Sequence, residues 1–255
     1  MIDRQGNLHT HGDLARTVRI ASVSKLYTAW ATMIAVEDGT TSLDAPVGQE
    51  GCTVRHLLSH AGGYSFDGVN PITSPERKRI YSNTGIEILA EHVAERAGMS
   101  FADYLYEAVC TPLGLTSTTL EGSPAKDVVS NVADCVKFTA ELRRPTLLAN
   151  ETVRSMTTVH FPHLEGVVPG LGRFDPCPWG LGAEIRGTKT PHWTAPHGSA
   201  ATWGHFGGTG TFLWVDPVAD VACVMLSNRE FTEWGLEHWP TFNDAVLAEA
   251  GQQRG

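Results

Sequence analysis

The sequence predicts an α+β fold with a helical insert. Three observations predict it: an apolar helix pattern follows Ser22, the middle of the chain keeps helical periodicity between long loops, and the last third changes to strand periodicity. The chain has 255 residues, of which 42% are hydrophobic and 18% are charged. This composition suits a protein with a buried core and argues against a disordered or coiled-coil protein.

The first part of the chain is expected to contain one buried helix. Residues up to Ile20 are polar and predict a short strand or a loop. From Ser22 onward, apolar residues recur at helical spacing until Gly39 ends the pattern. These residues are Leu26, Ala29, Trp30, Met33 and Ile34. A mainly apolar helix of about four turns is expected to lie inside the protein.

The middle of the chain predicts short helices separated by loops. Residues 54–60 form one, which ends at a pair of glycines. Residues 84–87 have the form of a capping box, with apolar residues on one helix face behind it. Residues 100–109 predict a third helix.

The last third predicts strands and a final helix. Strands are expected at residues 179–185, 209–215 and 221–226, and the last two form a hairpin. Pro240 is expected to precede a helix over residues 241–250.

Charge and cysteine content exclude several classes of protein. The net charge is −9, so a basic face for nucleic acid is not expected. No basic run suggests a membrane surface, no apolar run is long enough to span a bilayer, and the polar N-terminus does not look like a signal peptide. We therefore expect a cytoplasmic protein. The scattered cysteines argue against structural zinc and a disulfide framework: Cys52, Cys110, Cys135, Cys177 and Cys223.

Ser22 and Lys25 form an S-x-x-K motif at the start of the apolar helix. Residues three apart share a helix face, so the amine can reach the hydroxyl. Unpaired N–H groups at the helix start can stabilise an oxyanion, and burial would lower the pKa of Lys25 enough to activate Ser22. The alternative is an N-cap serine with a solvated lysine. The same spacing at residues 123–126, in a Gly/Ser/Pro stretch, is expected to be a surface turn.

Two further motifs carry reactive or binding groups. Tyr81 and Asn83 lie just before a predicted helix, where a phenol can relay a proton and an amide can orient a carbonyl. His205, Gly207 and Gly208 precede a predicted strand, where glycine lets another backbone approach closely. The alternatives are packing and capping for the first motif and a flexible turn for the second.

Together the three motifs resemble the S-x-x-K, Y-x-N and K-T-G or H-x-G signature of the serine β-lactamase and penicillin-binding protein superfamily. The chain is most similar to the class C-like branch of esterases and D-aminopeptidases, over about residues 12–229. The resemblance implies an antiparallel sheet flanked by helices, with the sheet domain made of residues 1–51 and 166–255. It also implies a helical insert over residues 52–165 and an active-site cleft between the two.

The resemblance implies a serine hydrolase that acylates Ser22 with a small ester or amide and uses no cofactor and no metal. Lys25 and Tyr81 would share the acid–base work, with the choice of base open, and Asn83 would bind a substrate carbonyl. The backbone amides of Ser22 and Gly208 would form the oxyanion hole. We expect neither nucleic acid nor membrane as a partner, and the oligomeric state is left open.

The third motif departs from the family pattern. His205 stands where a lysine is common, and Phe206 replaces a hydroxyl side chain. Both changes argue against strong carboxylate recognition and favour a neutral ester or amide beside an apolar patch. Because histidine titrates near neutral pH, carboxylate substrates are expected to bind better below about pH 6.

Several alternatives remain at this stage. One is a β-lactamase or D-amino-acid peptidase, and another is a catalytically inactive ligand-binding module on the same fold. His56 and His60 have zinc-ligand spacing, but no glutamate follows His56 and no third ligand is apparent, so a structural role is preferred. The chain contains no G-x-S-x-G motif, which disfavours an α/β-hydrolase.

Overall fold

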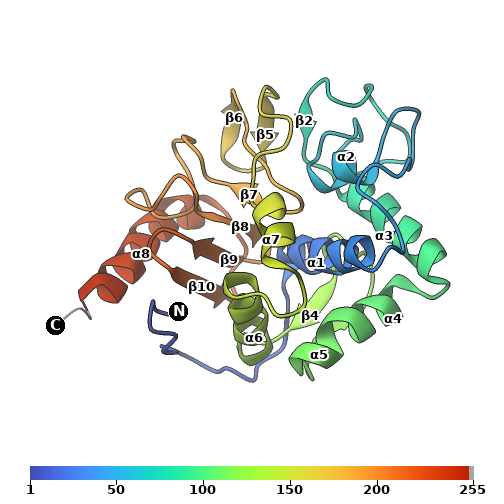
Figure 1. Cartoon of the computed structure of the whole chain (residues 1–255). Helices are drawn as coiled ribbons and strands as arrows, with labels where there is room; N and C mark the ends of the chain where they lie inside the picture. The colour runs from blue at the N-terminus through green and yellow to red at the C-terminus, as the bar shows by residue number, and fades with distance from the viewer. Residues whose placement is uncertain (253–255) are drawn as a thin grey trace.

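The computed structural model describes residues 1–252 and is built around a four-stranded antiparallel sheet in the order β10-β9-β8-β7 (Figure 1). Its strands are β7 (Glu184–Ile185), β8 (Trp203–Gly207), β9 (Thr211–Asp216) and β10 (Val221–Leu226). The helices are the short turn η1 (Ala21–Val23), α1 (Ser24–Glu37), α2 (Val54–Leu58), α3 (Asn83–Ala97), α4 (Phe101–Leu105), the π-turn η2 (Tyr106–Cys110), α5 (Thr111–Leu113), α6 (Val132–Arg143), α7 (Asn150–Met156) and α8 (Glu233–Gln252). None of the helices in this range combines the length and the hydropathy that crossing a bilayer requires.

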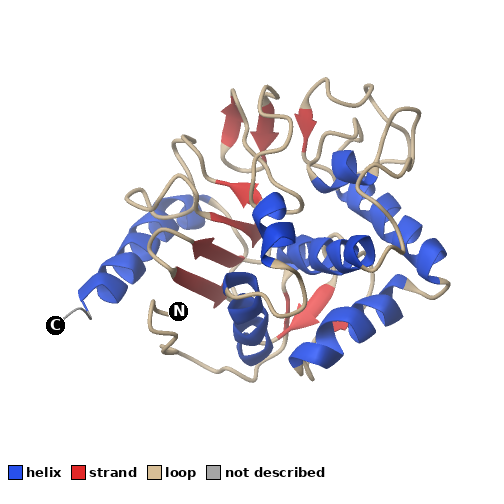
Figure 2. Cartoon of the chain, in the orientation of Figure 1, coloured by secondary structure: helices blue, strands red, loops and turns tan. Residues whose placement is uncertain are grey.

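The sheet lies between two layers of helices. Figure 1 shows α8 on one side and α1 and α6 on the other. Side chains of a strand point alternately to its two faces, so β9 contributes side chains to the hydrophobic cores on both sides of the sheet. Phe212 and Trp214 pack in the core beneath α8, whereas Leu213 and Val215 pack in the larger core around α1. The α+β class predicted from the sequence is therefore confirmed (Figure 2).

Two small sheets connect distant parts of the chain. One has the order β1-β4-β3, formed by β1 (Val18–Arg19), β4 (Val128–Ser130) and β3 (Thr119–Leu120). The other has the order β2-β5-β6, formed by β2 (Arg79–Ile80), β5 (Gly166–Val168) and β6 (Gly172–Phe174). Helix α6 packs against β9 and β10. Thus part of the range predicted as the helical insert contacts the main sheet, and the division into two domains stays a prediction.

The predicted helix after Ser22 is present and buried. Helix α1 follows the turn η1, and Trp30 and Met33 are among its buried residues. Gly182 packs tightly on this helix, since a Cβ there would lie 2.1 Å from the Cβ of Ala29. Gly182 also has φ +88°, and this left-handed backbone interrupts the strand predicted over residues 179–185, of which only β7 forms.

Strand β8 was not predicted, because its glycines suggested a turn. Gly204 is needed at a strand centre instead, since a Cβ there would lie 2.1 Å from the carbonyl oxygen of Leu213. His205 therefore lies within a strand. Gly207 pairs with Thr211, and the three-residue loop between them ends at Gly210 with φ +80°.

Two helix starts also differ from the predictions. Helix α3 begins at Asn83 because the Ser82 hydroxyl caps it by accepting the Gly85 N–H at 2.9 Å. Helix α8 begins at Glu233 and contains Pro240. Trp239 is buried against Phe231, with ring centroids 4.7 Å apart, and this packing holds the turns before the proline in helical form.

Candidate active site

Ser22 lies in the turn η1, immediately before α1 and beside the end of β8. Its neighbour Ala21 has φ +47°, an uncommon conformation for a residue with a side chain, and such strain is often found at functional positions. Gly207 makes the close approach of β8 possible, because a Cβ there would lie 2.5 Å from the Ile20 carbonyl oxygen. The backbones of β8 and η1 are therefore in direct contact beside Ser22.

Lys25 is fully buried and its amine has three hydrogen-bond partners. Nζ lies 3.2 Å from Ser22 Oγ, 2.6 Å from Asn83 Oδ1 and 2.9 Å from the Ala125 carbonyl oxygen. Burial, and secondly the positive charge of Lys126, lower the pKa of Lys25 to about 7. A large share of the amine is therefore neutral near neutral pH.

The partners of Lys25 determine how a neutral amine is oriented. The Asn83 amide nitrogen donates to Asp67 Oδ1 at 3.1 Å, which leaves Asn83 Oδ1 as an acceptor. The Ala125 carbonyl can also only accept. These two oxygens accept hydrogen bonds from both N–H groups of the neutral Lys25 amine. The lone pair of the amine is therefore directed at the Ser22 hydroxyl.

Tyr81 lies between Lys25 and His205. Its ring centroid is 4.7 Å from Lys25 Nζ, and its hydroxyl is 3.4 Å from His205 Nε2. Burial raises the pKa of Tyr81 well above its usual value, an effect that hydrogen bonding with Ser22 partly opposes. Tyr81 is therefore a neutral phenol that can donate a proton but does not ionise by itself.

His205 is buried and neutral. Nδ1 lies 2.7 Å from the Phe206 carbonyl oxygen, which can only accept, so Nδ1 carries the proton and Nε2 accepts from Tyr81. Burial, and secondly the charge of Lys25, lower the pKa of His205 to about 3. The expectation that His205 becomes charged near pH 6 and binds carboxylates is therefore wrong.

Gly208 follows β8 at the end of the site. Its carbonyl accepts the Phe231 N–H at 2.8 Å, and space for a side chain is open around it. Within residues 1–252, neither the Gly208 N–H nor the Ser22 N–H has a hydrogen-bond partner. Both amides are therefore free to donate to a substrate oxygen.

The loop over residues 123–126 lies at the site and is not a remote surface turn. The Ala125 carbonyl binds Lys25, and the Lys126 amine lies 3.7 Å from Asp67 Oδ1. Neither Ala125 nor Asp67 was predicted to belong to the site. A backbone carbonyl leaves no signal in a side-chain pattern, and Asp67 comes from a loop whose path the sequence does not reveal.

Phe206 and the two histidines with zinc-ligand spacing lie elsewhere. Phe206 packs against Phe231 in the core beneath α8, so it does not form the expected apolar patch at the site. His56 Nε2 lies 2.8 Å from Glu76 Oε1, whereas the buried His60 ring packs on Tyr81 with centroids 4.7 Å apart. Each histidine thus has a separate structural partner.

An apolar surface adjoins Tyr81 on its other side. Phe66 stacks near Tyr81, with ring centroids 5.8 Å apart, and half of the Phe66 side chain is exposed. Both rings line a pocket of about 310 Å³ together with Val167 and Pro169. Charged residues also line this pocket, and Glu165 there pairs with Lys78 and Arg173. This pocket can take a small apolar group close to the reactive side chains.

Comparison with known proteins gives consistent matches. The family model described as Beta-lactamase matches residues 16–248. The crystal structure of a beta-lactamase from Mycobacterium bovis is 47% identical, covers 98% of this chain and 93% of its own, and superposes with a TM-score of 0.96. Simvastatin synthase from Aspergillus terreus is 18% identical, with 99% and 93% coverage and a TM-score of 0.79, which shows a shared fold alone.

A sequence match of limited extent connects the chain to Penicillin-binding protein 4* from Bacillus subtilis. The two are 26% identical over 132 residues, which is 39% of this chain and 29% of that protein. The match thus spans less than a third of the length of this relative.

Proposed function

The chain belongs to the beta-lactamase family, whose serine hydrolase fold it shares, and from this premise we propose that it hydrolyses a small ester or amide through an acyl-enzyme on Ser22. The observation that carries the proposal is the arrangement of the buried Lys25 amine. Its two acceptor-only partners leave its lone pair for the Ser22 hydroxyl.

In the first step Lys25 acts as the general base. Neutral Lys25 takes the proton of Ser22 while Oγ attacks the substrate carbonyl carbon and the carbonyl π electrons move to its oxygen. The new ammonium keeps its bonds to Asn83 and Ala125. The amides of Ser22 and Gly208 donate to the oxyanion, and each such donor typically stabilises the transition state by about 2.7–4 kcal/mol.

In the second step Tyr81 acts as the general acid. The tetrahedral intermediate collapses, the bond to the leaving group breaks, and the leaving oxygen or nitrogen takes a proton from the Tyr81 hydroxyl. Lys25 Nζ and the Tyr81 hydroxyl both lie at Ser22 Oγ, so the Lys25 ammonium supplies the replacement proton across that oxygen. Water then repeats the sequence on the acyl-enzyme, which releases the acid and restores Ser22.

The surroundings of Tyr81 and His205 favour an uncharged substrate. His205 is neutral, so the third motif supplies no cation for a carboxylate. The pocket beside Phe66 suits a small apolar group. A β-lactamase activity is the second candidate, because the structure that is 47% identical is described as a beta-lactamase.

Covalent labelling tests the nucleophile. A fluorophosphonate probe should label the wild type, Ser22→Ala should abolish labelling, and Ser123→Ala, in the other S-x-x-K motif, should keep it. Mass mapping of the label to another residue, or full activity of Ser22→Ala, would overturn the proposal. A protein that takes no label and turns over no substrate would be an inactive binding module.

A substrate panel then separates the candidates. Short-chain aryl esters, a chromogenic cephalosporin and D-alanyl peptides should be run side by side on wild type and Ser22→Ala. We expect turnover of the esters to exceed that of the other two classes. Faster turnover of the cephalosporin would instead support the β-lactamase candidate.

A further inference from the structure

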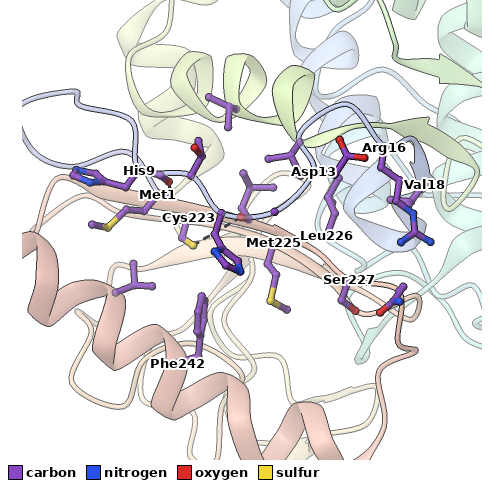
Figure 3. Close-up of a pocket in the computed structure, with 18 of the residues that line it drawn as sticks. Met1, His9, Asp13, Arg16, Val18, Cys223, Met225, Leu226, Ser227 and Phe242 are labelled. Atoms are coloured by element: carbon purple, nitrogen blue, oxygen red, sulfur yellow. Dashed lines mark hydrogen bonds between the residues drawn. The ribbon is translucent and has the colours of Figure 1, made fainter.

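The groups that can modulate the proposed reaction are those in contact with Lys25 and Asn83, and Asp67 is one of them. A larger groove, of about 820 Å³ along β10, is lined by none of the proposed catalytic residues (Figure 3). Asp67, by contrast, accepts a hydrogen bond from Asn83 Nδ2 at 3.1 Å. Asn83 Oδ1 accepts from the Lys25 amine at 2.6 Å, so a single side chain separates Asp67 from the proposed base.

The backbone on both sides of Asp67 is bound to the start of α3. The Phe66 carbonyl oxygen accepts the Asn83 N–H at 2.8 Å, and the Gly68 carbonyl oxygen accepts the Thr84 hydroxyl at 2.8 Å. These bonds hold Asp67 at a fixed place relative to Asn83, whose side chain is buried. Asp67 itself is exposed, so a substitution there leaves the core intact.

A neutral Lys25 amine does not by itself fix the orientation of the Asn83 amide. The amine has two N–H groups and a lone pair, so it can donate to Asn83 Oδ1 or accept from Asn83 Nδ2. If the amide is turned over, Nδ2 donates to the lone pair, which is then not available for the proton of Ser22. The orientation of Asn83 thus determines whether neutral Lys25 can act as a base.

A carboxylate selects one of the two orientations. An ionised carboxylate can only accept, so Asp67 pairs with Asn83 Nδ2 and leaves Asn83 Oδ1 facing Lys25. The Lys126 amine lies 3.7 Å from the same Asp67 oxygen, but a solvent-exposed ion pair of this kind adds little stability. The selection therefore depends on Asp67.

We propose that Asp67 is a positioning residue for the reaction at Ser22. Its carboxylate holds the Asn83 amide in the orientation that leaves the lone pair of neutral Lys25 free for the Ser22 hydroxyl. Asp67 thus acts through Asn83 rather than by contact with the reacting atoms. The inference rests on the function proposed above.

The charge of Asp67 has a separate effect on Lys25. Burial, and secondly the charge of Lys126, lower the pKa of Lys25, whereas Asp67 and Glu87 raise it. The other titratable groups nearby are neutral at neutral pH: His60, Tyr81 and His205. Removal of either carboxylate should therefore lower the pKa of Lys25 and move the acid limb of kcat/KM to lower pH.

Asp67→Asn tests the positioning role, because an amide can pair with either orientation of Asn83. With an aryl ester, we expect the acid limb at lower pH and a plateau of kcat/KM that is about tenfold lower. This loss is a part of the roughly 10²–10⁴-fold that a positioned base contributes. Asp67→Glu keeps a group that only accepts, so it should retain more of the plateau than Asp67→Asn.

Glu87→Gln is the matched control for charge. The Glu87 carboxylate accepts a hydrogen bond from the Ser123 hydroxyl, and glutamine keeps an oxygen for it. The acid limb should move in the same direction as in Asp67→Asn, whereas the plateau should stay within about twofold of the wild type. Urea unfolding checks that each variant keeps its fold.

A double-mutant cycle tests the route through Asn83. Asn83→Ala removes the amide that Asp67 orients and lowers activity by itself. In this background, adding Asp67→Asn should lower the plateau by no more than about twofold, because two residues that act through one interaction are not additive.

Two results would overturn the inference. The first is a moved acid limb with an unchanged plateau in Asp67→Asn, which would mean that Asp67 acts through its charge alone. The second is a loss of about tenfold that persists in the Asn83→Ala background. In both cases, labelling of Ser22 by a fluorophosphonate would leave the proposed function intact. A wild type that takes no label at Ser22 would overturn the function and the inference together.

Discussion

At the scale of single residues, the proposed chemistry depends on the charge of Lys25. Its pKa is about 7 because burial disfavours the ammonium and because Lys126 adds positive charge nearby. Replacing Lys126 by methionine removes that charge, so the pKa of Lys25 should rise. Since neutral Lys25 is the proposed base, the acid limb of the pH profile of kcat/KM should move to higher pH.

The measurement is hydrolysis of an aryl ester between about pH 5 and pH 9. Lys126→Met should lose activity relative to the wild type on the acid side and match it on the alkaline side. Lys137→Met, a change of the same kind at a lysine that contacts Gly114 and Asp134 instead, should leave the limb in place. An acid limb that does not move in Lys126→Met would contradict Lys25 as the titrating base.

The catalytic roles of Tyr81 and Lys25 can be distinguished with substrates that differ in their leaving group. A phenol that serves as the general acid matters most when the leaving group is a poor one. Tyr81→Phe should therefore slow amide hydrolysis by about 10²–10⁴-fold but slow aryl ester hydrolysis by only about tenfold or less. If both substrates lose activity equally, Tyr81 would instead share the role of base.

At the scale of elements, the junction of β8 with η1 sets the position of Ser22. Gly207→Ala would place a Cβ 2.5 Å from the Ile20 carbonyl oxygen, whereas Gly208→Ala enters open space. We expect Gly207→Ala to lower kcat/KM by about 100-fold through displacement of strand and turn. Gly208→Ala, which keeps its backbone amide, should retain activity, and equal kcat/KM in the two variants would argue against this role of Gly207.

The elements differ in how far the sequence reveals them. Helix α1 was predictable because its apolar residues are buried nearly all round, and the hairpin of β9 and β10 was predictable from strand periodicity. Strand β8 was not, since its glycines serve close backbone contact rather than a turn. The helical turns before Pro240 depend on tertiary contacts of Trp239, which local propensity does not contain.

At the scale of the whole molecule, the site is assembled from segments far apart in the chain. The motifs predicted Ser22, Lys25, Tyr81, Asn83 and His205 as candidates, and hydrogen bonds or ring contacts link each of them to another in the structure. The structure alone shows that Ala125 and Asp67 belong to the site, because the folded loops bring them into contact with Lys25 and Asn83. Motif spacing thus predicts reactive side chains, whereas backbone groups and electrostatic neighbours require the tertiary structure.

Burial of neutral histidine links the site to the acid stability of the whole protein. His205 has a pKa of about 3 in the folded state, against about 6.5 for histidine in the unfolded chain. Below pH 6.5 the unfolded state therefore binds a proton that the folded state does not, and stability falls as the pH falls. At about pH 5 the loss from this residue alone is about 2 kcal/mol relative to neutral pH.

Urea unfolding at about pH 7.5 and pH 5 measures this loss. His205→Gln, which cannot take up the proton, should reduce the difference between the two pH values by about 2 kcal/mol, even if it changes the stability at neutral pH. Glu184 has little effect on the measured difference. Because its pKa is lowered in the folded state, it changes the free energy of unfolding mainly below about pH 4.5. His60 stays neutral in both folded proteins, because burial is the main cause that lowers its pKa well below the usual value. An unchanged difference would therefore show that His205 is protonated in the folded state.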